Sequence, residues 1–153
     1  MRVYRVFERK HAASAFSGEG ALLYGGRWNS VGTAVVYTSG TFSLALLEIM
    51  ANTGTARIPP AMVYAPVDIP DEIHPAVLDV VSLPRDWFVY PAPVECQLAG
   101  DSWIRRGEAV ALVVPSAVAR IESNVLLNPL HRDFARLTIG DIETMAIDDR
   151  LIR

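Results

Sequence analysis

The sequence predicts a single α+β domain spanning residues 1–153. Short apolar segments rich in β-branched residues outnumber helical segments, and the two kinds do not alternate as they do in a doubly wound parallel sheet. Hydrophobic residues make up 51% of the chain and charged residues 20%, which is typical of a compact globular protein. A chain of 153 residues fits one such domain with a core of its own.

The start of the chain predicts two strands separated by a loop. Residues 3–7 alternate in polarity enough to indicate a first strand. Residues 17–32 (SGEGALLYGGRWNSVG) are rich in glycine, so we expect a structured loop with a short element inside it. Residues 34–38 (AVVYT) are apolar and β-branched, which predicts the second strand.

A helix follows this strand, because the next segment combines a cap, helical spacing and a stop. Thr41 or Ser43 can cap the first turn, and we expect the helix to run to about Asn52. Gly54 then provides the C-terminal stop.

The middle of the chain is punctuated by prolines. Residues 62–68 predict a strand, residues 71–93 are irregular with a strand near 77–81, and residues 94–106 suit a helix that ends at Gly107. The proline-rich stretch 58–93 is interpreted either as a partner surface or as a long connection.

The last third predicts further strands. Residues 109–114 form an apolar, β-branched run typical of a buried strand, closed by Pro115-Ser116. Two more short strands are expected at 118–122 and 125–127, and the pattern from residue 133 onward is mixed.

Charge and cysteine content exclude several classes of protein. The net charge of −3 provides no field that would attract nucleic acid or an anionic membrane. No apolar stretch approaches the length of a transmembrane helix, and the N-terminus lacks the apolar core of a signal peptide. The single cysteine, Cys96, cannot form an internal disulfide. We therefore expect a cytoplasmic protein that neither binds nucleic acid directly nor enters a membrane.

Common catalytic and metal-binding motifs are absent from the sequence. There is no P-loop, no H-E-x-x-H and no C-x-x-C, and Leu23 stands where the dinucleotide-binding fingerprint needs its last glycine. Three dispersed histidines and one cysteine do not provide the ligand cluster of a structural zinc site, so no metal is expected.

Two charged residues lie in unusual surroundings. Glu48 belongs to LALLEIM, a helical segment that is otherwise apolar, so its carboxylate must be paired wherever it is buried. The alternative is a position on the solvent-facing stripe of that helix. Arg27 lies in GGRWN, where flanking glycines allow close approach of the backbone to a ligand. The alternative is a turn held by an arginine–carboxylate pair.

Four further residues are candidates that also allow structural explanations. Tyr37 ends the AVVYT strand and can face either a cleft or the core, and Arg5 in VYRVF can bind an anion or lie on an exposed strand face. Ser116 can bind a ligand or form the turn after its strand, and Asn124 is a rim candidate or a turn residue.

Together these residues carry a resemblance to the RES domain family. The segments SGEGALLYGGRWN, VYTS and SLALLE resemble the N-terminal half of a RES domain, and GDSWI, LVVPSAV and ESNVLLNPLH resemble its C-terminal half. Arg27, Glu48 and Ser116 fall on the arginine, glutamate and serine positions for which that family is named. The resemblance is collinear and covers essentially the whole chain.

The resemblance implies a fold and an activity. RES domains are similar to ADP-ribosyltransferases, so it implies a split mixed β-sheet with flanking helices that binds NAD⁺ as a substrate, with no cofactor. It further implies the toxin of a type II toxin–antitoxin system that cleaves the nicotinamide–ribose bond, depletes NAD⁺ and arrests growth. The implied partner is an Xre-like helix-turn-helix antitoxin, in a complex that can include a homodimer of the toxin.

The resemblance also assigns roles to the candidate residues. Glu48 is expected to stabilise the ribosyl cation that forms when nicotinamide leaves, by the logic of glycoside hydrolysis. Arg5 and Arg27 are expected to bind the pyrophosphate, and Tyr37 to stack on the nicotinamide ring. Ser116 is expected to bind the nicotinamide amide or a ribose hydroxyl, with Asn124 on the rim.

Three alternatives remain open from the sequence. Water as acceptor gives an NAD⁺ glycohydrolase, phosphate gives a phosphorylase, and a protein acceptor gives an ADP-ribosyltransferase. A different class of function is a non-catalytic binding module that has kept the fold and lost the chemistry.

Overall fold

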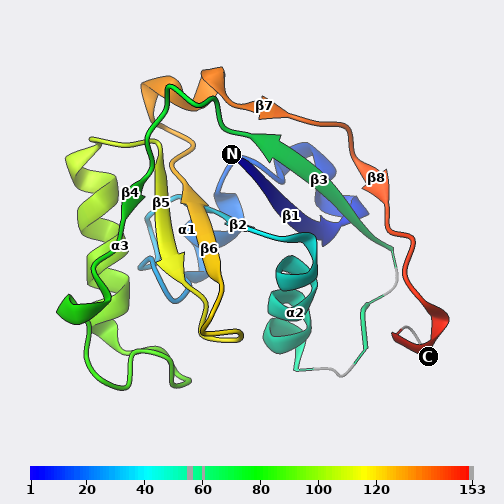
Figure 1. Cartoon of the computed structure of the whole chain (residues 1–153), viewed down its shortest axis with the longest axis horizontal. Coiled ribbons are helices and arrows are strands. Elements are labelled where there is room, and N and C mark those ends of the chain that lie inside the picture. Colours follow the sequence, from blue (N-terminus) through cyan, green and yellow to red (C-terminus); the bar gives the residue numbers. More distant parts are fainter. Residues whose placement is uncertain (55–56, 60, 152–153) are drawn as a thin grey trace.

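The strands form one mixed sheet. The computed structural model describes residues 1–54, 57–59 and 61–151, so residue 60 of the proline-rich stretch and the last two residues of the chain lie outside the described part. The strand order is β4-β5-β6-β2-β1-β3-β7, and β8 also pairs with β3 (Figure 1). The β4–β5 pair is parallel and the other pairs are antiparallel. The bounds are β1 Arg2–Glu8, β2 Val36–Ser39, β3 Met62–Asp68, β4 Ala76–Val77, β5 Ala111–Pro115, β6 Ser123–Leu127, β7 Thr138–Ile139 and β8 Glu143–Thr144.

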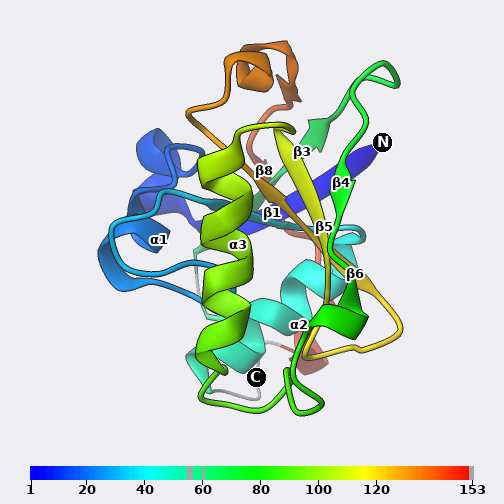
Figure 2. The ribbon, with the colours of Figure 1, turned by 90° about the vertical axis from the view of Figure 1, so that its left-hand side faces the viewer.

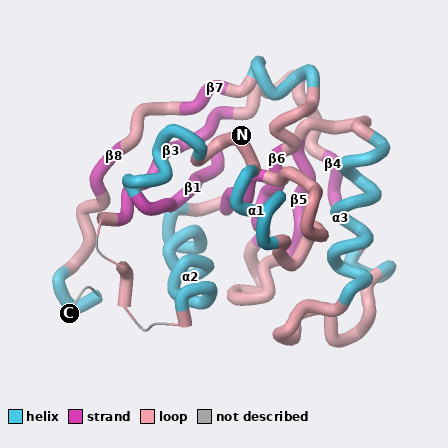
Figure 3. Tube along the Cα trace, turned by 180° about the vertical axis from the view of Figure 1, so that it is seen from behind, coloured by secondary structure: helices cyan, strands magenta, loops and turns pink. Residues whose placement is uncertain are grey.

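Helices flank this sheet, which confirms the predicted α+β class. Figure 2 faces α3, which packs along the β4–β5–β6 part of the sheet, and Figure 3 shows α1 and η1 in front of the strands when the molecule is seen from behind. The α-helices are α1 Glu19–Tyr24, α2 Phe42–Thr53 and α3 Val94–Arg106, and the 3-10 helices are η1 Arg9–Ser14, η2 Val80–Ser82, η3 Arg132–Arg136 and η4 Asp149–Leu151.

The sheet is split between β1 and β2. Only one register pair, Tyr4 with Ser39, joins these two strands, whereas β1 pairs with β3 along its whole length. Because the ladder ends after one pair, the sheet divides into a β4–β5–β6–β2 part and a β1–β3 part with β7 and β8 (Figure 1). A different helix covers each part, whereas a buried cluster that includes Val3, Val36, Val67 and Val125 is continuous across both parts.

The two covers come from different helices. Cys96 and Trp103 of α3 pack with Trp28 against Leu112 and Leu126 of β5 and β6. On the other part, α2 contributes a separate apolar cluster with β1 and β3, whose buried members are Val6, Ala45, Ile58 and Met62. Burial of apolar surface of this kind is the main favourable contribution to folding.

The predicted helix boundaries are confirmed by their caps. The side chain of Thr41 accepts a hydrogen bond from the backbone N–H of Leu44 at 3.1 Å, which satisfies an end group of α2. Gly54 and Gly107 follow α2 and α3 with φ angles of 64° and 57°, a left-handed conformation that glycine adopts without strain. The structured loop also contains the short element expected in it, which is α1.

Two predicted strands are wrong. Residues 118–122 form a turn, because the Ser116 hydroxyl accepts hydrogen bonds from the N–H groups of Val118 and Ala119 and so directs the chain away from an extended path. The strand expected near 77–81 is limited to β4, since the Asp79 side chain caps the 3-10 helix η2 that follows. The other predicted strands are present, and the strand expected at 62–68 has those bounds in the structure.

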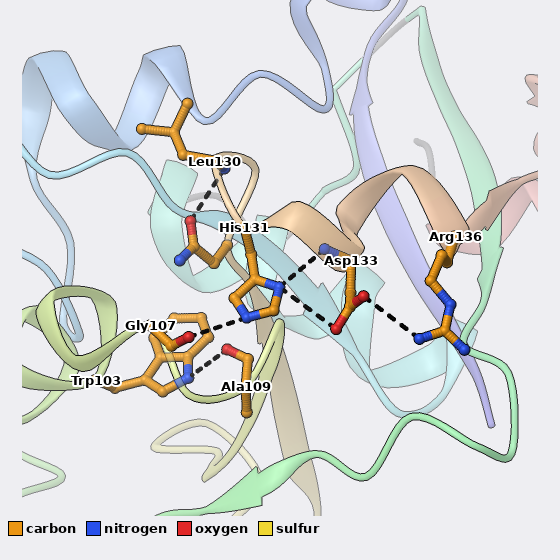
Figure 4. Close-up of polar contacts among 8 residues, drawn as sticks. Trp103, Gly107, Ala109, Leu130, His131, Asp133 and Arg136 are labelled. Atoms are coloured by element: carbon orange, nitrogen blue, oxygen red, sulfur yellow. Dashed lines mark hydrogen bonds and ion pairs between the residues drawn. The ribbon is translucent and has the colours of Figure 1, made fainter.

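His131 joins the end of α3 to the turn before η3 (Figure 4). Its Nδ1 accepts a hydrogen bond from the Asp133 N–H at 3.0 Å, so Nε2 carries the ring proton and donates it to the Gly107 carbonyl at 3.1 Å. Nearby, Trp103 Nε1 donates to the Ala109 carbonyl at 3.0 Å. These bonds fix the connection between α3 and β5 beneath the β6–η3 turn.

Gly100 lets α3 lie directly against the backbone of the Arg27 loop. A Cβ at Gly100 would overlap the carbonyl oxygen of Trp28, whereas a Cβ at Gly20 in α1 would meet nothing within 4 Å. We expect Gly100→Ala to lower the free energy of unfolding by about 1–3 kcal/mol or more, as overpacking of a close contact does. Gly20→Ala is the matched control and should be neutral or stabilising, because alanine favours a helix. Urea unfolding of both variants measures the difference, and an undestabilised Gly100→Ala variant would contradict this packing.

Candidate active site

Glu48 lies at the split of the sheet and is held through one oxygen. Its Oε1 accepts hydrogen bonds from Ser116 Oγ at 2.8 Å and from Asn124 Nδ2 at 2.6 Å. Glu48 is half-buried, and its Oε2 makes no hydrogen bond to any described residue and is not among the buried unpaired atoms. The carboxylate is therefore fixed in orientation while its second oxygen stays available. Within the described part of the chain, the carboxylate has two neutral donors as partners and forms no ion pair.

Asn124 is oriented from its other side by Ser39. Because a carboxylate can only accept, Nδ2 of Asn124 must face Glu48, and Oδ1 then faces Ser39 Oγ at 2.7 Å. The two residues face each other in the β2–β6 register, and both are buried, with 8% of Asn124 and 4% of Ser39 exposed. A line of hydrogen bonds thus runs from Ser39 through Asn124 to Glu48.

Ser116 is fully engaged by protein groups. Its hydroxyl accepts from the N–H groups of Val118 and Ala119, at 3.1 and 2.9 Å, and donates to Glu48. These three bonds use both lone pairs and the proton of a serine hydroxyl. Ser116 therefore both forms the turn after its strand and binds the candidate carboxylate.

The hydroxyl of Tyr37 is likewise engaged, and its ring is partly buried against the cluster that includes Trp28 and Leu126. The hydroxyl donates to Asn29 Oδ1 at 2.7 Å and accepts from the N–H of Trp28 at 3.0 Å. Burial raises the pKa of Tyr37 well above its ordinary value, so the phenol stays neutral. A Cβ at Gly26 would lie 2.6 Å from this hydroxyl oxygen, so the second glycine of GGRWN is needed for the close approach to Tyr37.

The loop that carries Arg27 is tied down at several points. Asn29 Nδ2 donates to the carbonyls of Ala21, Ser30 and Thr33, and Asp101 of α3 accepts from the Ser30 N–H at 3.0 Å. Burial raises the pKa of Asp101, but its hydrogen bonds from Ser30 and Thr33 outweigh this effect, so its pKa lies below the ordinary value. Asp101 therefore stays ionised and anchors the loop to α3.

Arg27 itself has no carboxylate partner. Its Nη1 donates to the carbonyl oxygen of Trp87 at 2.6 Å, and it forms no ion pair with a described residue. The structure therefore does not support the alternative in which an arginine–carboxylate pair holds this turn. The rest of this half-buried guanidinium retains donors for an anion.

Arg5 fills the gap where β1 and β2 separate. Its Nη1 donates to the Tyr37 carbonyl at 2.7 Å, and its buried Nε has no hydrogen-bond partner among the described residues. Burial without an anionic neighbour lowers the pKa of Arg5 to about 10. Arg5 alternates along β1 with Tyr4 and Val6, which α2 covers, so its stem starts on the opposite face of the sheet.

All six residues named from the sequence are thus linked around the split. Glu48, Ser116 and Asn124 share direct hydrogen bonds, Arg5 contacts the backbone of Tyr37, and Arg27 adjoins the Trp28 N–H that binds the Tyr37 hydroxyl. Asn29, Ser39 and Asp101 complete this arrangement and were not singled out from the sequence. GGRWN, VYTS and GDSWI contain them, but nothing in those segments says which distant residue each will meet.

Two surface hollows lie apart from these residues. One of about 530 Å³ is bordered by residues around Gly107 and His131, and one of about 300 Å³ is bordered by Ile58, Met62, Met145 and Ile147 among others. Neither is lined by a residue of the Glu48 cluster, which consists of Glu48, Ser116, Asn124 and Ser39. Among the described residues there is no group of three or more side chains able to hold a metal ion, and we find no helix with the length and apolar character needed to cross a bilayer.

Comparison with known proteins identifies the family. The RES domain model matches residues 2–148. The chain belongs to the RES domain family. It is 37% identical to "Toxin Res" of Photorhabdus laumondii, over 100% of this chain and 98% of that protein. It is also 32% identical to the "Prs ADP-ribosylating toxin" of a Sphingobium strain, over 95% of this chain and 91% of the relative.

A solved structure shares the fold of this RES domain. The M. tuberculosis MbcT–MbcA toxin–antitoxin complex contains a chain that superposes with a TM-score of 0.74 at 19% identity, covering 94% of this chain and 83% of that one. At this level of identity the likeness concerns the fold. It agrees with the sheet architecture expected from the sequence.

Proposed function

We propose that this RES domain is the toxin of a toxin–antitoxin pair and cleaves NAD⁺ between nicotinamide and ribose. The observation that carries the proposal is the state of Glu48, a half-buried carboxylate fixed through Oε1 with Oε2 unbonded. Two arginines that form no ion pair with a described residue, Arg27 and Arg5, lie around the same split of the sheet. A free carboxylate oxygen and unpaired cations suit a substrate with a ribose and a pyrophosphate.

The reaction assigned to Glu48 is heterolysis of the N-glycosidic bond. The C1′–N bond breaks and its electron pair goes to the pyridinium nitrogen, so nicotinamide leaves as a neutral molecule. Oε2 accepts a hydrogen bond from the ribose 2′-hydroxyl and stabilises the positive charge that develops at C1′. When water is the acceptor, its oxygen bonds to C1′ and one proton is released, giving ADP-ribose.

The other residues bind and orient. Arg27 offers its remaining N–H donors to the pyrophosphate, and the ring of Tyr37 provides a stacking surface for nicotinamide. The hydroxyl of Ser116 already makes three hydrogen bonds within the protein, and the amide of Asn124 binds Glu48. We therefore assign both residues to holding Glu48 and not to direct binding of NAD⁺. No step of this reaction calls for a cofactor.

Arg5 is proposed as a second anion-binding group, and its burial gives a test by unfolding temperature. Burial lowers the pKa of Arg5 below its ordinary value to about 10, so the folded chain holds this proton less tightly than the unfolded chain, and the charge opposes folding below about pH 10. Arg5→Met keeps much of the side-chain length and removes the charge. We expect this variant to unfold at or above the wild-type temperature at pH 7.

Inorganic pyrophosphate then separates binding from packing. Anything that binds only the native state raises its unfolding temperature. We expect pyrophosphate to stabilise the wild type and to stabilise Arg5→Met less than half as much. Arg2→Met, on the same strand but exposed and paired with Asp68, is the control and should respond like the wild type. An undiminished response of Arg5→Met would remove Arg5 from the anion site.

The acceptor is either a small molecule, water or phosphate, or a protein. The open Oε2 of Glu48 suits a small acceptor such as water or phosphate, whereas the name of the Sphingobium relative favours transfer of ADP-ribose to a protein. Chromatography of purified chain with NAD⁺ alone, with added phosphate and with cell lysate distinguishes them. ADP-ribose indicates water, ADP-ribose 1″-phosphate indicates phosphate, and labelled protein indicates transfer. Intact NAD⁺ under all three conditions would overturn the proposal and favour a binding module.

The partner and the cellular effect belong to the same proposal. The fold neighbour comes from a toxin–antitoxin complex, which supports an antitoxin partner for this chain. The proposed partner is an Xre-like helix-turn-helix protein, which would supply any contact with DNA. Induced expression of the chain should lower intracellular NAD⁺ and stop growth, and co-expression of a helix-turn-helix antitoxin encoded beside it should restore both; absence of such a gene would count against the toxin role. Growth arrest with normal NAD⁺ would separate toxicity from NAD⁺ cleavage.

A further inference from the structure

Ser39 is linked to Glu48 by two consecutive hydrogen bonds. Its hydroxyl donates to Asn124 Oδ1 at 2.7 Å, and Asn124 Nδ2 donates to Glu48 Oε1 at 2.6 Å. The three residues come from β2, β6 and α2, the elements that meet at the split of the sheet.

The direction of these bonds is fixed by chemistry. The carboxylate of Glu48 cannot donate, so the amide of Asn124 must present Nδ2 to it and Oδ1 to Ser39. The hydroxyl of Ser39 must then donate. Without that hydroxyl, Oδ1 would be a buried acceptor with no partner, and the amide could gain hydrogen bonds by rotating away from Glu48.

Ser39 is also placed where its position is well defined. It forms the one register pair that joins β2 to β1, opposite Tyr4, and it faces Asn124 in the β2–β6 ladder. Both neighbouring strands therefore fix its backbone, and its side chain is 4% exposed. A residue this rigid can hold the amide in one rotamer, as the supporting groups of a preorganised site do.

We propose that Ser39 is a positioning residue for the NAD⁺-cleaving reaction, acting through the Asn124 amide on the orientation of Glu48. The inference rests on the proposed function, because the orientation of Glu48 has a kinetic effect only if Glu48 acts on a substrate. Ser39 itself makes no contact with NAD⁺ in this arrangement. Its loss should therefore lower kcat and leave KM nearly unchanged.

Thr38 provides a matched control. It is the preceding residue, is 3% exposed, and its Oγ1 donates one hydrogen bond to the Val125 carbonyl at 2.6 Å. Its side chain points to the opposite face of the same strand, away from Glu48. Ser39→Ala and Thr38→Val each remove one buried hydroxyl bond, so the two variants should lose similar stability.

Steady-state kinetics of nicotinamide release tests the proposal. We expect Ser39→Ala to lower kcat about tenfold and to leave KM within twofold of the wild-type value. A tenfold loss corresponds to the upper end of the net contribution of one hydrogen bond. Thr38→Val should keep kcat within twofold. In an Asn124→Ala background, Ser39→Ala should have no further effect, because the two residues act in one chain. Equal kcat values for Ser39→Ala and Thr38→Val, or full additivity with Asn124→Ala, would overturn the proposal.

A spectroscopic readout separates failure of this inference from failure of the proposed function. The side-chain amide of Asn124, assigned by its absence in Asn124→Asp, should show slow exchange of the proton bound to Glu48. We expect faster exchange and a changed chemical shift in Ser39→Ala but not in Thr38→Val. An unchanged Asn124 signal in Ser39→Ala would contradict the positioning role. If the signal changes as expected but no variant or wild type releases nicotinamide, the geometry stands and the proposed reaction is wrong.

Discussion

Replacement of Glu48 by glutamine is expected to abolish measurable nicotinamide release while the fold is kept. The amide oxygen of glutamine can accept the bonds from Ser116 and Asn124, so the side chain should keep its place. The negative charge beside C1′ is lost, and loss of one preorganised group of this kind lowers kcat by about 10²–10³. NAD⁺ binding, measured by calorimetry, should change by only a few-fold, because the arginines are untouched.

Glu122→Gln is the matched control for Glu48→Gln. Glu122 immediately precedes β6 and accepts a hydrogen bond from Thr41 Oγ1 at 2.9 Å, a bond that an amide oxygen can also accept. This variant loses the same charge at the edge of the same region and should release nicotinamide at the wild-type rate. Wild-type activity in a folded Glu48→Gln variant would exclude Glu48 from the mechanism.

Replacement of Arg27 by methionine is expected to weaken NAD⁺ binding strongly. A hydrogen bond to a charged group contributes about 1.5–3 kcal/mol, so we expect the dissociation constant to rise roughly 10- to 100-fold. Arg27→Lys should recover part of the loss, because lysine keeps the charge but lacks the planar fork that binds a phosphate through two donors. Calorimetric titration in the Glu48→Gln background measures binding without turnover.

Arg132→Met is the control for Arg27→Met. Arg132 is exposed and lies beside the hollow near His131, apart from the Glu48 cluster. Its replacement removes one positive charge from the molecule and should leave the dissociation constant unchanged. If Arg27→Met and Arg132→Met bind NAD⁺ equally well, Arg27 has no role in phosphate recognition.

The sequence predicted the elements whose signals are local. The cap at Thr41, the stops at Gly54 and Gly107, and the apolar run of β5 each lie within a few residues of the element that they define. The turn at 118–122 was mistaken for a strand because its decisive bond comes from the side chain of Ser116, which competes with extended structure in a way that hydrophobic patterning does not record.

The same limit applies to the candidate site, where local sequence patterns indicated single residues but not their distant partners. An apolar helix with one carboxylate indicated that Glu48 needs partners, but those partners are 68 and 76 residues away on other elements. The split of the sheet brings them together, and it depends on the end of one ladder after the Tyr4–Ser39 pair. The resemblance to RES domains indicated which residues form the site. The structure shows in addition which donors bind Oε1 of Glu48.

The most direct test of the NAD⁺-cleaving role is a proton NMR time course of NAD⁺ with the purified wild-type chain and with Glu48→Gln. The nicotinamide ring protons report the N-glycosidic bond without a label or a coupled assay. We expect the pyridinium signals to be replaced by those of free nicotinamide in the wild-type sample and to persist with Glu48→Gln. Persistence of the pyridinium signals in the wild-type sample, with water, phosphate and lysate protein supplied as acceptors, would contradict the NAD⁺-cleaving role.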